Sequence, residues 1–119
     1  MKMSESRPEE LIRAENLMYD GKVEEAFEIV INFEKRSELT PKDQLSALLL
    51  RGLIHFFRVQ LKDVINVGEI AYPMSQELGL IPESIEALLL KAQVYNFLKY
   101  DEALMFLTGI LRFSSYFFG

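Results

Sequence analysis

The chain has 119 residues, of which 50% are hydrophobic and 26% charged, with a formal net charge of -5 and no cysteine. This size predicts one domain over residues 1–119, and the apolar content excludes a disordered chain. The negative charge argues against a nucleic-acid partner, because phosphate binding needs a concentrated positive field. The lack of cysteine excludes disulfides and thiolate metal sites and fits a cytoplasmic location. No uncharged apolar run reaches about 18 residues, so a membrane-spanning helix is not expected.

A first helical hairpin is predicted over about residues 8–37. Ser6 and Pro8 resemble a capping box with proline in the first helical turn. Gly21 ends that helix, since glycine tolerates the left-handed conformation that follows a helix end. Apolar residues at helical spacing then predict a second amphipathic helix, namely Val23, Ala26, Phe27, Val30 and Phe33.

A second hairpin is predicted over about residues 41–79. Thr40 is the candidate cap of its first helix, which is apolar nearly all round and is therefore placed in the middle of the fold. Its second helix is predicted from about Leu61 to Leu78, with Gly79 as the stop. Pro73 interrupts this helix, and we expect a kink or break near Ala71–Tyr72, because proline lacks a backbone donor and clashes one turn back.

A third hairpin is predicted over about residues 82–114. Pro82 and Glu83 begin its first helix, and a sixth helix is expected to start near Tyr100–Asp101. The fold class predicted by these elements is all-α, with three tandem antiparallel hairpins of about six helices.

Small residues recur at matching points of the three hairpins. They lie 38 to 40 residues apart: Ala14, Gly52 and Ala92 in the first helices, and Ala26, Val64 and Ala103 in the second. Antiparallel helices approach closely only where side chains are short, so these positions predict contacts that repeat along the chain.

These residues resemble the tetratricopeptide repeat. The entries to the second helices carry the resemblance, in Gly21-Lys22-Val23-Glu24-Glu25-Ala26 and in Lys99-Tyr100-Asp101-Glu102-Ala103. The period is longer than the usual 34 residues and is similar to the long-repeat variety. The resemblance implies a short right-handed α-solenoid; a degenerate helical-repeat relative is the structural alternative.

No constellation of residues indicates catalysis. His55 is the only histidine, and its apolar neighbours favour a packing or rim position over a ligand or base. The acidic pairs Glu24–Glu25 and Asp101–Glu102 lie at helix starts, where carboxylates favour the helix dipole. We therefore predict a non-enzymatic protein without catalytic residues, cofactor or metal site.

The resemblance implies a partner-binding groove lined by the first helix of each hairpin. The positions it selects are Glu15, Tyr19, Leu53, Phe56, Phe57, Gln93, Asn96 and Phe97. Aromatic side chains beside amides suit an extended peptide or an amphipathic helix. The competing interpretation is that Leu53, Phe56 and Phe57 are core residues. The predicted function is a protein- or peptide-binding scaffold, and the alternative is a regulatory sensor arm that binds a small signalling ligand.

The tail, residues 103–119, is strongly apolar and carries only one charged residue, Arg112. Its candidate self-association residues are Phe106, Ile110, Phe113, Tyr116, Phe117 and Phe118. Such a surface predicts a homodimer through the C-terminal hairpin, and further repeats beyond the chain would also cover it. Contact with a membrane surface is disfavoured, because the tail lacks a basic polar face.

Overall fold

The computed structural model describes the backbone of residues 7–118 and the side chains of residues 7–100. The described part is entirely helical, as predicted. Its helices are α1 (Glu9–Tyr19), α2 (Val23–Glu34), α3 (Pro41–Phe57), α4 (Leu61–Glu77) and α5 (Ile81–Phe118).

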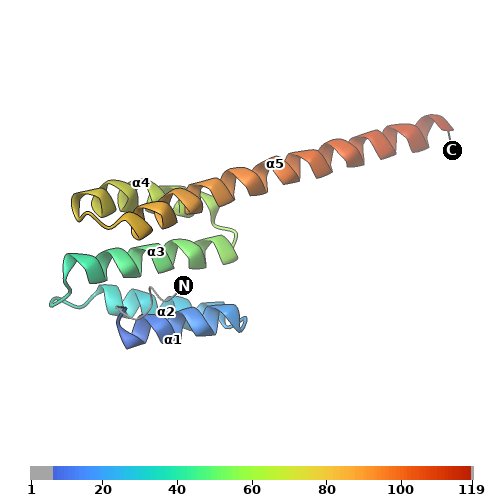
Figure 1. Ribbon diagram of the computed structural model, residues 1–119. Coiled ribbons are helices and arrows are strands. Elements are labelled where there is room, and N and C mark those ends of the chain that lie inside the picture. The colour runs from blue at the N-terminus through green and yellow to red at the C-terminus, as the bar shows by residue number, and fades with distance from the viewer. Residues whose placement is uncertain (1–6, 119) are drawn as a thin grey trace.

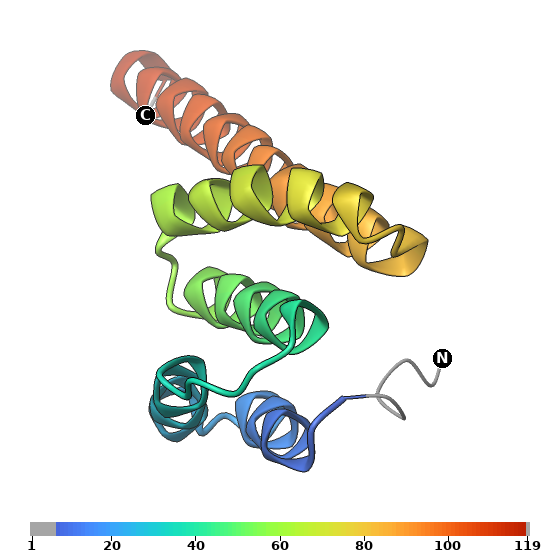
Figure 2. The ribbon, with the colours of Figure 1, turned by 90° about the vertical axis from the view of Figure 1, so that its left-hand side faces the viewer.

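Helix α3 lies at the centre of the molecule, which confirms its predicted position. It packs against each of the other four helices. The pair formed by α1 and α2 covers one side of α3, while α4 and the first half of α5 cover the other (Figures 1 and 2). The body therefore has two layers of core that share α3.

The two halves of the core are apolar and well filled. One joins α1 and α2 to α3 through residues that include Leu11, Met18 and Ile54. The other joins α3 to α4 and α5 through residues that include Val64 and Leu90. Among the described side chains, no buried polar atom lacks a hydrogen-bond partner, so neither core layer carries an unpaired polar group.

Three helices end in the same left-handed turn. The residue with positive φ is Gly21 after α1, Val59 after α3 and Gly79 after α4. In each turn the next amide donates to the carbonyl five residues earlier, as in the bond from Gln60 N to His55 O of 2.8 Å. This is the Schellman arrangement, which normally selects glycine. Valine at the second turn adopts a conformation that costs about 1–2 kcal/mol for a residue with a Cβ.

The starts of the helices agree with the sequence in part. Thr40 Oγ1 accepts a hydrogen bond from Asp43 N at 3.1 Å, which confirms the predicted cap of α3. Pro8 lies at the N-cap of α1 rather than inside its first turn, and Ser6 lies outside the described residues. Pro73 lies within α4, which continues to Glu77, so of the expected kink or break a break is excluded.

The largest difference from prediction concerns α5. One helix of 38 residues runs from Ile81 to Phe118, and no turn separates a sixth helix near Tyr100. Its C-terminal half projects beyond the other helices (Figure 1). Ala14 and Gly52 are buried as predicted, but Ala92 is exposed because no second helix of a third hairpin covers it.

Helix α5 has two apolar faces within the described side chains. The inner face consists of Ala87, Leu90 and Val94, which are buried against α3 and α4. The outer face consists of Ile81, Ile85, Leu88, Ala92 and Tyr95, all of which are exposed. The two faces lie on opposite sides of the helix, since equivalent positions differ by about two residues, or about 200°.

Candidate partner-binding groove

The eight residues predicted to line a groove lie on three helices that are not consecutive. Glu15 and Tyr19 come from α1, three further residues from α3, and Gln93, Asn96 and Phe97 from α5. Helix α3 contacts both α1 and α5, so the three helices form one side of the body. The structure therefore brings the predicted residues onto one surface, although their role in binding stays a prediction.

The deepest part of this surface is a pocket of about 200 Å³ between α1, α3 and α5. Four of the predicted residues line it, namely Glu15, Tyr19, Leu53 and Gln93. Its apolar wall comes from leucines of α3 and α5, Leu49, Leu50, Leu89 and Leu90. A pocket of this volume accommodates an amino-acid side chain, since sites for drug-sized ligands measure about 300–1,000 Å³.

One end of the pocket is acidic. Glu15 from α1 and Glu86 from α5 both contact the Arg7 guanidinium, at 3.5 and 3.3 Å respectively. Burial raises the pKa of the Glu86 carboxyl above its usual range; the charge of Arg7 opposes that rise, and Glu83 and Glu15 add to it. Two carboxylates facing one guanidinium leave this end with a net negative charge.

The other end of the groove is aromatic. Phe56, Gln93, Asn96, Phe97 and Tyr100 line a second, shallower hollow, which shares Gln93 with the pocket. Phe56 and Phe97 meet edge to face with ring centroids 6.1 Å apart. Tyr19 and Phe57 form a similar pair at 6.0 Å. These contacts join all three helices along one continuous surface.

Burial separates the three α3 residues that the core interpretation had grouped together. Leu53 and Phe56 are partly buried and pack against the core, so that interpretation holds for much of their area. Phe57 is 43% exposed, and Tyr19 and Phe97 are exposed beside it. The aromatic rings of the groove therefore remain accessible at its rim.

His55 lies outside the groove and is buried at the contact between α2 and α3. Its Nδ1 lies 2.7 Å from Gln60 Oε1, within hydrogen-bonding distance. Its ring packs edge to face on Phe27, with centroids 5.7 Å apart. Since Gln60 follows Val59, the bond from His55 supports the turn that carries the strained residue.

Sequence reasoning missed Arg7 and Glu86. Glu86 precedes Gln93 by seven residues, a spacing that places both on one side of a helix, so helical spacing from Gln93 could have indicated it. Arg7 lies just before α1, where no periodicity applies, and nothing in the sequence indicates that it contacts α5.

The predicted self-association residues Phe106, Ile110, Phe113, Tyr116, Phe117 and Phe118 lie outside the described side chains. Within the described residues, no three potential metal ligands lie together, and no helix combines the length and apolarity needed to cross a bilayer. Comparison with protein-family models, with curated proteins and with solved structures found no match. The resemblance to tetratricopeptide repeats therefore rests on the residues of this chain.

Proposed function

We propose that the chain is a tetratricopeptide-like, non-enzymatic interaction module that binds a peptide segment of a protein in the groove between α1, α3 and α5. The observation that carries this proposal is the gathering of the eight residues from three separate helices along one surface, which has an acidic end and an aromatic end. Such a surface suits an extended peptide or an amphipathic helix, which would insert apolar anchors between the rings.

The finer fold assignment belongs to the same proposal. The shared turn after α1 and α3, and the burial of Ala14 and Gly52 at matching positions, support repeated hairpins arranged as a right-handed α-solenoid. A Cβ at Gly52 would lie 2.7 Å from Val67 Cγ1, so the small residue is needed for the helices to approach. A cytoplasmic location is part of the proposal and is supported by the cysteine-free composition.

The acidic end defines the chemistry of the preferred peptide. Arg7 of the same chain forms salt bridges with Glu15 and Glu86, at 3.5 and 3.3 Å. A lysine or arginine of a bound peptide would meet the same two carboxylates, while its neighbours contact the leucine wall. We therefore expect peptides that combine one basic residue with two or more large apolar residues.

A selection from a peptide library displayed on phage tests this function. The enriched peptides should bind with an affinity that falls about tenfold or more in Tyr19→Ala, since a truncated rim aromatic costs more than about 1 kcal/mol when it is an anchor. The matched control is Ile70→Ala, because Ile70 lies on α4 and is 57% exposed where Tyr19 is 63% exposed. Enriched peptides that bind both variants equally would contradict the proposal.

A second variant tests the charge preference. Glu86→Gln keeps the shape of the side chain and removes the charge that would pair with a basic residue. Affinity for basic peptides should fall, and the loss should shrink as salt rises. Unchanged affinity and unchanged salt dependence would remove the acidic end from the site.

The alternative, a sensor arm that binds a small signalling ligand, draws support from the pocket but fits it less well. A volume of about 200 Å³ between α1, α3 and α5 leaves little room for a whole small molecule. A rise in melting temperature with a metabolite library, abolished by Leu53→Asp, would favour this alternative, since a ligand stabilises the folded state by mass action.

A further inference from the structure

The outer face of α5 is apolar, long and uncovered. Ile81, Ile85, Leu88 and Tyr95 expose 71%, 52%, 49% and 60% of their surface, and Ala92 lies between them. Their spacing alternates between four and three residues, which is the average period of 3.5 that keeps a stripe facing one partner helix. A shallow hollow surrounds Ala92, of the kind that accepts a large side chain; it is lined by Leu89, Gln93, Tyr95, Asn96 and Lys99.

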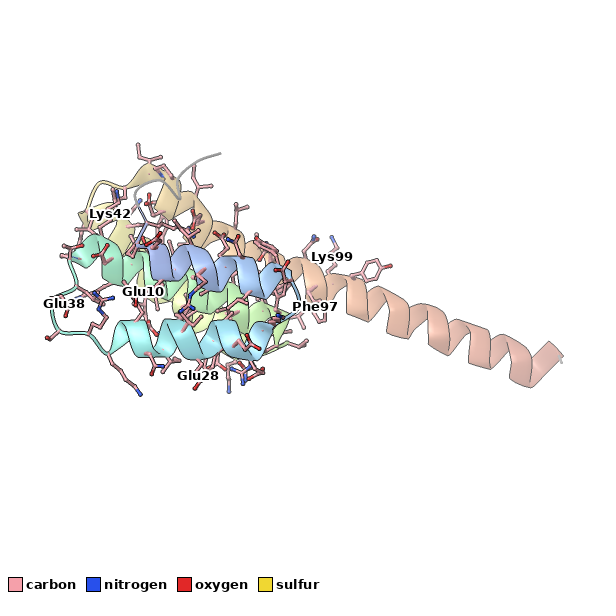
Figure 3. All side chains as sticks on the ribbon, turned by 90° about the horizontal axis from the view of Figure 1, so that it is seen from below. Glu10, Glu28, Glu38, Lys42, Phe97 and Lys99 are labelled. Carbon is pink, nitrogen blue, oxygen red and sulfur yellow. The ribbon has the colours of Figure 1, made fainter. Side chains whose placement is uncertain are left out.

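The same spacing continues through the projecting half of the helix. Continued beyond Tyr95, it selects Lys99, Glu102, Phe106, Gly109, Phe113 and Tyr116. All of these positions fall on one helix of 38 residues, so the spacing continues in the sequence to Tyr116 along a single helix. Figure 3 labels Lys99 where α5 leaves the body, on the opposite side of the helix from Phe97.

We propose that the outer face of α5 binds the same face of a second copy of this chain, with the two helices antiparallel about a two-fold axis near Tyr100. Each copy would then supply the helix that covers the other copy's outer face, in place of the sixth helix expected within one chain. An isologous contact of this kind closes after two subunits.

The charged residues that face each other in this arrangement have opposite charges. With the axis between Tyr100 and Asp101, Lys99 of one copy lies level with Glu102 of the other, and symmetry forms that pair twice. Opposite charges at the centre of a seam fix orientation and register, because a parallel pair would place Lys99 beside Lys99.

The opposed residues also match in size. Ala92 lies level with Gly109 of the second copy, so the helices approach closely there. Tyr95 lies level with Phe106, and Leu88 with Phe113, so that large apolar side chains flank the close approach. The projection of α5 beyond the body leaves space for a second copy beside its C-terminal half (Figure 1).

The seam and the groove lie on neighbouring surfaces of α5 and are tested by different residues. The seam is centred on the outer face, whereas the groove is centred on Phe97 together with α1 and α3; Gln93 and Asn96 border both. Failure of the peptide experiment would leave the dimer unaffected, and failure of the dimer would leave the groove proposal unaffected.

Cross-linking between single-cysteine variants tests the proposal, and the absence of native cysteine makes the products unambiguous. Ala92→Cys and Gly109→Cys are purified separately, mixed and treated with a short bis-maleimide. The mixture should give a covalent dimer, since the two positions lie level across the seam. Each variant alone should stay monomeric after treatment, because two copies of the same position lie about 25 Å apart at a rise of about 1.5 Å per residue.

The double variant, with both cysteines in one chain, distinguishes the dimer from the helical hairpin that was expected from the sequence. If the C-terminal half turned back onto its own chain, the double variant would cross-link within one chain and the mixture would give no dimer. That outcome would overturn the proposal. Cross-linking of each single variant to itself would also overturn it, since it indicates a parallel arrangement.

Charge reversal provides a second test. Lys99→Glu places like charges at the centre of the seam and should weaken the dimer about tenfold or more. The double variant Lys99→Glu with Glu102→Lys should restore the wild-type dissociation constant. A dimer that is insensitive to Lys99→Glu would overturn the arrangement.

Discussion

The two faces of α5 are similar in sequence and opposite in burial. Leu90 on the inner face is 5% exposed, whereas Leu88 on the outer face is 49% exposed, two residues away on the same helix. The inner face packs on α3 and α4, and nothing within the described part of the chain covers the outer face. An apolar stripe at helical spacing therefore does not indicate by itself whether the chain's own core covers that face.

The strongest contrast between the faces should come from truncating one leucine on each. Leu90→Ala should lower the free energy of unfolding by about 2–5 kcal/mol, because it leaves a cavity in the core between α3, α4 and α5. Leu88→Ala should change it by less than about 1 kcal/mol in dilute protein, where the chain is monomeric. Urea unfolding followed by circular dichroism measures both, and equal losses would contradict the division into two faces.

The close packing behind the inner face predicts the next effect. A Cβ at Gly52 would lie 2.7 Å from Val67 Cγ1 and 2.8 Å from Leu90 Cδ1. Gly52→Ala should lower the free energy of unfolding by about 1–2 kcal/mol, since overpacking outweighs the gain in helix propensity of about 1 kcal/mol.

Gly68→Ala provides the comparison for Gly52→Ala. The nearest atom to its added Cβ is Lys91 Cγ, on a flexible side chain, although Ala87 O also lies 3.2 Å away. Gly68→Ala should therefore lower the free energy of unfolding by less than Gly52→Ala does. A larger decrease for Gly68→Ala in urea unfolding would contradict this ranking of the two contacts.

The turn between α3 and α4 predicts a gain in stability. Val59 has a φ of 58° where the equivalent turns have Gly21 and Gly79. Val59→Gly should raise the free energy of unfolding by about 0.5–1 kcal/mol, because relief of the left-handed strain exceeds the extra entropy of the unfolded chain.

The reverse change gives the control for this turn. Gly79→Ala introduces the same strain after α4 and should lower the melting temperature, whereas Val59→Gly should raise it. A melting temperature that falls in both variants would show that the Val59 side chain stabilises the turn.

The smallest effect concerns the carboxyl beside the inner face. Because burial raises the folded-state pKa of Glu86 above its usual value of 4.5, the folded protein binds that proton more tightly than the unfolded chain. The free energy of unfolding should therefore fall as pH rises through the range just above 4.5. Glu86→Gln should flatten that decline in urea titrations between pH 4 and 7, and an unchanged slope would contradict the assignment.

Much of the fold follows from local signals in the sequence. Gly21, Gly79 and the cap at Thr40 delimit helices whose apolar spacing already predicts their inner faces. No separate sixth helix forms. The segment Lys99-Tyr100-Asp101-Glu102-Ala103 has no glycine to end a helix and contains good helix formers, so α5 continues through it. Val59 shows that such a turn also forms without glycine, but there the His55 and Gln60 side chains support it.

The repeat spacing selected eight residues that lie on α1, α3 and α5, and their role in binding stays a prediction. Arg7 was not predictable, since its contact with Glu86 joins residues 79 positions apart in the sequence. Contacts of that kind depend on how the helices pack, and no local pattern encodes them.

Sedimentation equilibrium of the full chain over a wide range of concentrations, with Leu88→Asp and Ile70→Asp beside it, tests the assignment of the outer face most directly. The wild type and Ile70→Asp should approach twice the monomer mass of 13.8 kDa as concentration rises. Leu88→Asp should stay at the monomer mass while keeping its helical circular dichroism signal. A wild-type chain that remains at 13.8 kDa throughout, with α5 intact, would contradict the account.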